Sequence, residues 1–333
     1  MGGINVRSLH VIHPSRYLHA YLYLQTTQRQ NLTRLYQVSK TTRPKLQFSI
    51  SQSRKETMSD IATRRQICED TIKRSEHVTA TTPGASLSSA FITDTTYAPL
   101  SPSDPTFPAL TLQHIEVIDS DTFLCARTLL GPNPSLQNKL AVLNLASDEE
   151  PGGGWRYTLS KTQEEALCYS STLFATLRRE WYPWPNTGEG SVAGIFSPDV
   201  AVFKDTLDNE CAELDEGERV LVSVVTVAAP RGPKLTSDGQ EFKDQNVLEE
   251  FRGKIRLVLR CCAREGKTAL VLGALGCGAY RCPPKLVARE MKQVLEEEEF
   301  GGWFERVVFA VYAAGPVGKR NFEVFRAVFG NED

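Results

Sequence analysis

The stretch VLNLASDEEPGGGWRYTLSKTQEEALCY, residues 142–169, decides the fold. It begins as an apolar run, passes through three glycines at 152–154, and reaches Gln163, Glu164 and Glu165 after eight more residues. The apolar run predicts a buried strand, and the apolar spacing after Gln163 predicts a helix. Glycines allow positive φ and let backbone N–H groups approach an anion without a Cβ in the way. The stretch therefore predicts an anion site and two carboxylates in one crevice at a strand's carboxyl end, where α/β sheets bind ligands.

The same residues also have a purely structural interpretation. Thr162 and Glu165 have the spacing of a capping box, in which two side chains satisfy the free N–H groups at a helix start. A glutamate in the first turn is also favoured by the helix dipole. Spacing alone leaves helix cap and catalytic acid open as alternatives, and three glycines by themselves are typical of a flexible loop.

A second glycine loop follows another predicted strand. The run LVLGA at 270–274 leads into LGCGAY at 275–280, and Pro283 and Pro284 mark the start of a helix. A glycine-rich turn before a helix start is typical of a phosphate or diphosphate site. Tyr280 could stack on a ribose or base there. The alternative is an ordinary tight turn with Tyr280 as a core aromatic.

Outward from these loops, strand-like and helical patterns alternate. Strands are expected at 114–118, 140–146, 200–203, 220–228, 269–274 and 307–312. Helices are expected at 60–77, 122–130, 163–180, 246–264, 284–299 and 321–329. Residues 79–108 are rich in Ser, Thr, Pro and Ala, and they predict a loop that wraps over the body. Continuous apolar strands are buried on both faces, so the pattern predicts a three-layer α/β fold around a mixed or mostly parallel sheet.

Composition excludes several classes of function. The chain of 333 residues carries a net charge of −2, but residues 1–55 hold nine Lys/Arg and no acid, which leaves −11 on the rest. Such an acidic body is a poor non-specific binder of nucleic acid. The longest nearly apolar run, 220–230, is too short for the ~18 residues of a membrane span.

Cysteine and histidine usage argues against a metal site. Eight cysteines occur without a CxxC pair, and only His77 and His114 lie beyond residue 55. Zinc requires clustered ligands, so no metal is expected. In a chain long enough to bury a core, these cysteines indicate reduced thiols of an intracellular protein.

Residues 1–57 differ from the rest of the chain. They are Arg-rich, free of acid through Lys55 and rich in Ser and Thr, a composition typical of a mitochondrial transit peptide. The alternatives are a disordered tail or an untranslated upstream extension, with Met58 as the start. We expect the folded domain to span 58–333, with a nuclear or cytoplasmic location if translation starts at Met58 and a mitochondrial one if the extension is a transit peptide.

Several of these motifs together resemble those of one known family. The sequence VLNLAS followed by GGG-x8-QEE resembles the signature of the poly(ADP-ribose) glycohydrolases, in particular the short microbial and fungal type. Further similar blocks are IFSPDVAVFKD at 195–205, SVVTVAAP at 223–230, LGALGCGAYRCPP at 272–284 and RRQICEDT at 64–71. The resemblance covers roughly residues 60–329. It implies a macrodomain-like fold and an enzyme without metal or cofactor.

The resemblance also assigns roles to residues. Glu165 matches the catalytic glutamate, and Glu164 the neighbour that holds the ribose hydroxyls. Asn144 matches the strand-end residue that contacts the distal ribose, and Tyr280 the aromatic that shapes the ribose site. The catalytic loop around the scissile bond would comprise Gly152, Gly153, Gly154 and Gln163. The diphosphate loop would comprise Gly276, Cys277, Gly278 and Ala279. Two departures bear on substrate length: a bulky 155–162 segment, and Arg231 where Asn is expected.

The implied reaction is hydrolysis of ribose–ribose O-glycosidic bonds, mainly at chain ends. It requires a carboxylic acid that protonates the leaving oxygen, with its pKa raised by burial under substrate and by the adjacent Glu164. The alternatives are a macrodomain reader that binds ADP-ribose without cleaving it, and a hydrolase for single ADP-ribose groups on side chains. A reader has no use for two carboxylates beside an anionic ligand. Expected partners are poly(ADP-ribose) and ADP-ribosylated proteins, with no direct nucleic-acid or membrane contact, and the enzyme is expected to act as a monomer.

Overall fold

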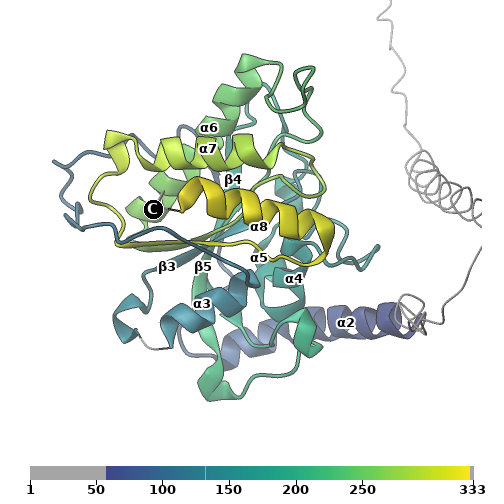
Figure 1. Ribbon diagram of the computed structural model, residues 1–333. Helices are drawn as coiled ribbons and strands as arrows, with labels where there is room; N and C mark the ends of the chain where they lie inside the picture. Colours follow the sequence, from purple (N-terminus) through teal and green to yellow (C-terminus); the bar gives the residue numbers. More distant parts are fainter. Residues whose placement is uncertain (1–57, 132, 331–333) are drawn as a thin grey trace, which may run out of the picture. The chain divides into compact units, whose positions relative to one another are not determined.

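The computed structural model describes residues 58–131 and 133–330, so the prediction made for residues 1–57 lies outside the described part. A mixed sheet forms its centre (Figure 1). It has seven strands in the order β1-β4-β5-β3-β6-β7-β2. The strands are β1 (Ala90–Thr93), β2 (Glu116–Ile118), β3 (Leu140–Leu145), β4 (Ala193–Val202), β5 (Val220–Val227), β6 (Ala269–Leu272) and β7 (Arg306–Ala310). Strand β4 runs antiparallel to both of its neighbours, and the other pairs are parallel.

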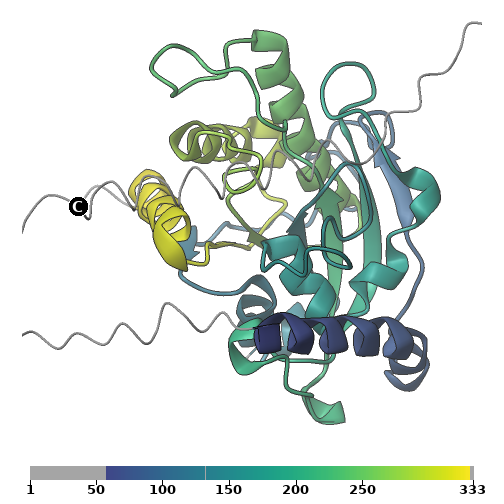
Figure 2. The same cartoon turned by 90° about the vertical axis from the view of Figure 1, so that its right-hand side faces the viewer.

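Helices cover both faces of this sheet, as Figures 1 and 2 show. The α-helices are α2 (Met58–Thr81), α3 (Thr122–Leu130), α4 (Gln163–Ser170), α5 (Leu173–Thr176), α6 (Gln245–Arg264), α7 (Pro284–Leu295) and α8 (Gly315–Phe329). Helices α2 to α5 lie on one face, and α6, α7 and α8 lie on the other. The three-layer α/β prediction is confirmed.

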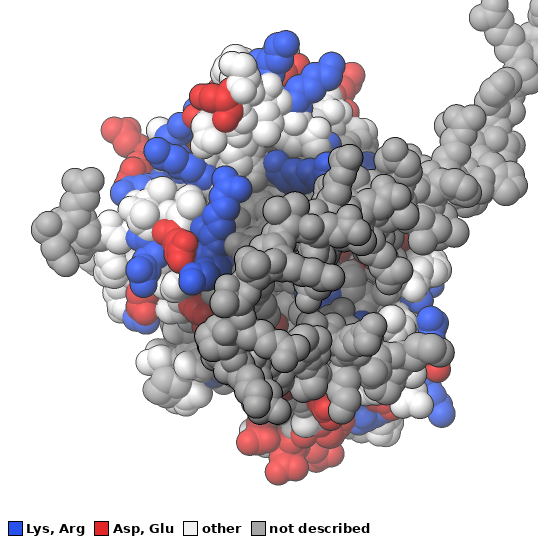
Figure 3. Space-filling model, turned by 45° about the vertical axis from the view of Figure 1, so that its right-hand side comes forward, with Lys and Arg blue, Asp and Glu red and all other residues white. Residues whose placement is uncertain are grey.

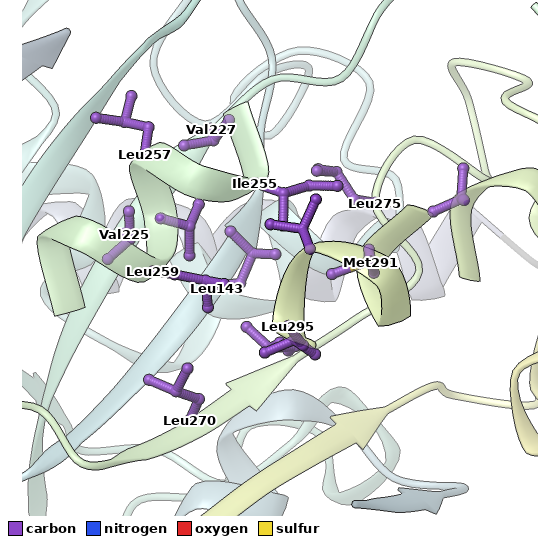
Figure 4. Packing of buried hydrophobic residues seen from close by; sticks show 14 of the residues in the cluster. Leu143, Val225, Val227, Ile255, Leu257, Leu259, Leu270, Leu275, Met291 and Leu295 are labelled. Carbon is purple, nitrogen blue, oxygen red and sulfur yellow. The ribbon is translucent and has the colours of Figure 1, made fainter. Parts of the chain in front are cut away.

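Alternate residues of each central strand enter two separate cores. On β3, Ala141 and Leu143 belong to the core under α6 and α7, whereas Leu140 and Val142 belong to the core under α3 and α4. Figure 4 shows the first core, in which residues of β3, β5 and β6 meet those of α6 and α7. Burial of both faces explains why these strands are continuous apolar runs, since each buried Leu or Val contributes roughly 1.5–3 kcal/mol.

Ion pairs join helix α6 to helix α7 and to the turn that follows α7. Arg252 Nε lies 2.6 Å from Glu290 Oε2, and Arg256 and Arg260 bind Glu297 and Glu299 at 2.7 and 2.6 Å. On the face shown in Figure 3, Lys and Arg side chains likewise lie among Asp and Glu.

The predicted helix at 163–180 is wrong beyond Ser170. Helix α4 ends there, α5 covers only Leu173–Thr176, and a 3₁₀ turn follows at Arg179–Trp181. The backbone at 170–172 pairs instead with the end of β4: Thr172 N donates to Ala201 O at 3.0 Å, and Phe203 N donates to Ser170 O at 3.0 Å. Hydroxyl side chains favour such a break because they offer the backbone alternative hydrogen bonds.

The predicted loop at 79–108 is also partly wrong. Helix α2 continues to Thr81, and β1 (Ala90–Thr93) is an edge strand that pairs with β4. Strand β4 starts at Ala193, whereas the sequence predicted a strand only from residue 200. The prediction missed the first part of β4, since a bulge between Ser197 and Val200 interrupts its ladder with β5. The bulge includes Pro198, and it breaks the alternation of inward and outward side chains by which a strand is recognised in a sequence.

Within the described ranges, no helix has the length and apolar character needed to cross a membrane. The same residues contain no group of three or more His, Cys, Asp or Glu side chains arranged to hold a metal. All eight cysteines fall in the described part, where each is buried and none forms a disulfide.

Candidate active site

Three adjacent parallel strands, β3, β5 and β6, end at the same edge of the sheet. The loops that follow them, 146–162, 228–232 and 273–283, therefore meet above that edge, as expected for a ligand site in an α/β fold. A direct bond joins two of them: Tyr280 Oη donates to Asp148 Oδ1 at 2.6 Å. The two glycine loops singled out in the sequence thus form one site.

The first glycine loop brings the backbone against both glutamates. Gly153 has φ +55°, and a Cβ there would lie 3.1 Å from Glu164 Oε2. A Cβ on Gly154 would lie 3.1 Å from Glu165 Oε1 and 2.5 Å from Thr158 Oγ1. Side chains at these positions would push the carboxylates away, so close approach requires both glycines, and Gly153 is required by its conformation as well.

Glu164 is 3% exposed and tied to the end of β3. Its Oε2 accepts from Ser147 N at 2.8 Å, and its Oε1 accepts from Asn144 Nδ2 at 3.4 Å. Burial raises the pKa of Glu164 to about 8, and these hydrogen bonds oppose the rise without cancelling it. A pKa of about 8 favours the neutral form of Glu164 near pH 7.

This raised pKa predicts a pH-dependent gain in stability for Glu164→Gln. From pH 4.5 to about 8 the unfolded chain loses this proton while the folded chain keeps it, so the free energy of unfolding of the wild type falls as pH rises. Glutamine removes that titration. We expect the Tm advantage of the variant to grow across this interval by roughly 10–20 °C, because the rise from 4.5 to about 8 corresponds to ~5 kcal/mol and ~1 kcal/mol moves Tm by ~2–4 °C in a domain of this size.

Thermal melts between pH 4.5 and 9 measure this effect. Glu180→Gln, which alters an exposed glutamate, is the matched control. An advantage for Glu164→Gln that stays constant over the whole interval would contradict the assignment of a neutral, buried Glu164.

Glu165 is also 3% exposed and serves as the helix cap that its spacing predicted. Its Oε2 accepts from Thr162 N at 3.1 Å and from the Ser160 hydroxyl. In the described part of the chain nothing donates to its Oε1, which faces the glycine loop at Gly154. One oxygen is thus fixed by the helix start and the other is available for a ligand, so the two interpretations of this residue are compatible.

The side chain of Gln163 binds the end of strand β3. Both ends of its amide bind the backbone of β3: Nε2 donates to Leu143 O at 2.8 Å, and Oε1 accepts from Leu145 N at 2.9 Å. Strand β3 pairs with β6 only as far as Val142, so these backbone groups have no strand partner. Gln163 replaces the missing partner and thereby positions the two glutamates that follow it.

Asn144 is likewise a positioning residue in this structure. Its side chain is fully buried, and Nδ2 donates to Thr226 Oγ1 at 3.2 Å as well as to Glu164. The implied contact with a ribose is not available to Nδ2, which is already engaged. Its Oδ1 is buried without a partner among the described residues.

The second glycine loop presents free backbone donors. Cys282 N donates to Gly276 O at 3.0 Å, Arg281 N to Gly278 O at 3.1 Å, and Gly232 N to Tyr280 O at 2.8 Å, which fixes the loop through its carbonyls. Within residues 58–131 and 133–330, no acceptor binds the N–H groups of Gly278, Ala279 or Tyr280. Successive free N–H groups of this kind suit a diphosphate.

Inside that loop the side chains of Cys277 and Tyr280 face the protein. Cys277 is 6% exposed, and burial holds the pKa of its thiol well above the usual range, so it contributes packing rather than a nucleophile. Tyr280 is half-buried and touches both cores, and its hydroxyl is engaged by Asp148. The tyrosine therefore links the two loops in addition to any contact with a ribose.

Sequence reasoning missed the group that holds these loops together. Asp148 is buried, and Arg231 Nη2 lies 2.8 Å from its Oδ2, with a second bond from Arg231 to Glu149. The Arg231 guanidinium also lies over the Tyr280 ring, 5.9 Å from its centroid. Arg231 departs from the family pattern in the sequence, but its pairing with Asp148 could not be predicted, because the two residues lie 83 positions apart along the chain.

Comparisons with known proteins show which family and which solved structures this chain is similar to. The family described as "Microbial-type PARG, catalytic domain" matches residues 20–205, more than half of the chain. Poly(ADP-ribose) glycohydrolase (PARG) from Thermomonospora curvata is 28% identical with a TM-score of 0.65, covering 80% of this chain and 99% of that one. A further structure of the T. curvata protein carries the inhibitor ADP-HPD, at 27% identity and a TM-score of 0.63 over the same shares of the two chains.

PARG from Deinococcus radiodurans, in complex with ADP-ribose, is 28% identical with a TM-score of 0.58, covering 77% of this chain and 98% of that one. A search of curated proteins finds no match. The family match spans β3, the first glycine loop and the start of α4, which carries both glutamates. The chain therefore belongs to the family of microbial-type poly(ADP-ribose) glycohydrolases.

Proposed function

We propose that this glycohydrolase releases ADP-ribose mainly from the ends of poly(ADP-ribose), with Glu165 as its catalytic acid and base. The observation that carries the proposal is the pair of buried carboxylates under a glycine loop, opposite a second loop with free N–H groups. The T. curvata protein was crystallised with ADP-HPD and the D. radiodurans protein with ADP-ribose, which supports ADP-ribose as the group held here.

In the proposed mechanism, Gly278, Ala279 and Tyr280 bind the diphosphate through backbone N–H groups. This places the terminal ribose beside the free Oε1 of Glu165. Protonated Glu165 donates to the leaving ribose oxygen as the glycosidic bond breaks, and the sugar passes through an oxocarbenium-like state. The resulting carboxylate then accepts a proton from the attacking water, so the acid is regenerated.

Glu164 has a different task, because consecutive helix residues point about 100° apart. As a neutral acid it can donate a hydrogen bond to a ribose hydroxyl, and it adds no second negative charge beside the anionic substrate. Asn144 and Ser147 hold it in place. Ionisation of Glu164 above about pH 8 would remove the donor and introduce repulsion.

We further propose that residues 58–333 form the catalytic domain and that residues 1–57 lie outside it. Residues 1–55 hold nine Lys/Arg and no acid, and this change of composition supports a boundary near Met58. The proposed partners are the polymer and the proteins that carry it, and the proposed state is a monomer. The eight free, buried cysteines support an intracellular location.

Labelled poly(ADP-ribose) incubated with the full chain and with residues 58–333 tests these proposals together. The expected product is monomeric ADP-ribose from the first time points, with both proteins active. Mono-ADP-ribosylated protein in a parallel reaction separates a hydrolase of single groups from a polymer hydrolase. Binding of the polymer without any product would indicate a reader instead.

A further inference from the structure

We propose that Arg156 and Tyr157, at the tip of the first glycine loop, bind the adenosine unit on the leaving side of the scissile bond. The proposal deepens the function given above and rests on it. The ligand would be the purine base and the adjoining diphosphate of the polymer unit next to the cleaved ribose.

Arg156 and Tyr157 lie on a hydrogen-bonded turn that directly follows Gly154, the glycine beside Glu165. Tyr157 N and Thr158 N both donate to Gly154 O, at 2.9 and 2.8 Å, so the chain folds back immediately after the glycine that touches Glu165. Trp155 is fully buried and packs against Tyr169 and Phe174, with ring centroids 5.7 and 4.8 Å apart. Residues 156 and 157 are therefore fixed relative to the carboxylate.

The packing of the domain does not account for the exposure of this ring. Tyr157 is 60% exposed, the highest fraction among the exposed large hydrophobic residues of the described part. The preceding Trp155 already anchors the turn, so the fold gains little from a second aromatic. An exposed aromatic ring beside a catalytic group is a suitable surface for a nucleobase, because every base can stack on it.

The neighbouring cation has no acid of its own. The Arg156 guanidinium lies 5.2 Å from the ring centroids of both Tyr157 and Phe174, and Nη2 donates to Tyr157 Oη at 3.0 Å. No carboxylate in residues 58–131 or 133–330 pairs with it, whereas Arg231 at the same site binds two. A positioned guanidinium without a carboxylate is available to a phosphate.

The substrate supplies groups that match this pair. In a linear poly(ADP-ribose) chain, the oxygen that leaves the cleaved ribose is a hydroxyl of the next adenosine. Protonation of that oxygen by Glu165 therefore brings an adenine and a diphosphate beside the acid. A single ADP-ribose on a protein side chain has neither group on its leaving side, so Arg156 and Tyr157 would favour polymer over mono-modified protein.

Binding to the full-length Glu165→Gln protein tests the proposal without requiring turnover. A labelled ADP-ribose trimer and monomeric ADP-ribose are titrated separately. Adding Tyr157→Ala is expected to weaken trimer binding about tenfold and to leave the Kd of monomeric ADP-ribose unchanged within about twofold. Adding Tyr157→Phe, which keeps the ring, is expected to restore most of the trimer affinity.

Arg156→Gln is expected to weaken trimer binding by several-fold, with a steeper loss at low salt. Ile72→Ala, which removes an exposed apolar side chain from α2, is the matched control and should change neither affinity. Thermal melts check that each variant is folded, and Arg156→Lys replaces Arg156→Gln if the loss of contact with Phe174 unfolds the loop.

The outcomes separate this proposal from the proposed function. Equal trimer affinity in Tyr157→Ala and in the parent would overturn the adenosine site, even if the wild type hydrolyses polymer. Equal loss of monomer and trimer affinity would also overturn it, since the loop would then serve the first ADP-ribose. A wild type that binds trimer but releases no ADP-ribose would overturn the glycohydrolase mechanism alone.

Discussion

Glu165→Gln is expected to lower kcat on poly(ADP-ribose) by about 10³-fold while the Kd for ADP-ribose stays within about threefold. Glutamine keeps the shape of the side chain but cannot deliver or accept the proton, and general acid–base catalysis contributes roughly 10²–10⁴-fold. The variant should stay folded, because the glutamine carbonyl can accept the same bonds from Thr162 N and Ser160. Single-turnover assays and calorimetry measure the two quantities.

Glu165→Ala separates the two tasks of this residue. Alanine removes the helix cap as well as the acid, so it should lose similar activity and about 1 kcal/mol of stability, which Glu165→Gln should retain. If Glu165→Gln kept kcat within about tenfold of the wild type, a change of ~1.4 kcal/mol in the barrier, Glu165 would be a helix cap only. The acid would then have to be sought elsewhere in the site.

The charge of Glu165 acts on its neighbour in the chain. The charge of Glu165 contributes to the raised pKa of Glu164, although burial is the larger cause. Burial and the neighbouring charge act in the same direction and favour the neutral form of Glu164.

The sequence predicted the strands and loops of the site because their signals are local. Strand β3 is a continuous apolar run, and the start of α4 carries both a cap and two acids. The break after Ser170 could not be predicted, because it depends on backbone bonds to Ala201 and Phe203, about 30 residues further along the chain.

The same reason explains why the supporting bonds of Gln163 and Asn144 were not predicted. Whether Gln163 meets a ligand or the backbone depends on where the pairing of β3 with β6 ends, which no local pattern reveals. Asn144 was correctly placed at the end of β3, but its bond to Glu164 appears only when α4 packs beside that strand. A sequence therefore shows which chemical groups lie at a site, but not which of them contact a ligand and which hold other residues in place.

A pair of substitutions in the second glycine loop is expected to separate ligand binding from folding. Gly278 has no positive φ, and a Cβ there would meet nothing within 4 Å. Gly278→Val should therefore fold normally, with Tm within about 2 °C of the wild type. Gly276 has φ +77°, and its Cβ would lie 2.5 Å from Ala229 Cβ and 2.8 Å from Cys282 Sγ.

Gly276→Val combines a disfavoured φ with overpacking, each of which costs roughly 1–3 kcal/mol. Its Tm should fall by roughly 5–15 °C, since ~1 kcal/mol corresponds to ~2–4 °C in a domain of this size. Valine is therefore strained at position 276 and not at position 278.

Gly278→Val is expected to weaken ADP-ribose binding by roughly tenfold or more. Its branched side chain would stand beside the free N–H groups of residues 278–280 and keep a diphosphate from approaching them. Calorimetry with ADP-ribose and thermal melts on the same samples measure both effects. Unchanged affinity in a normally folded Gly278→Val protein would mean that this loop is an ordinary turn. The diphosphate would then bind at another loop, and the terminal ribose could no longer be placed against Glu165 by this route.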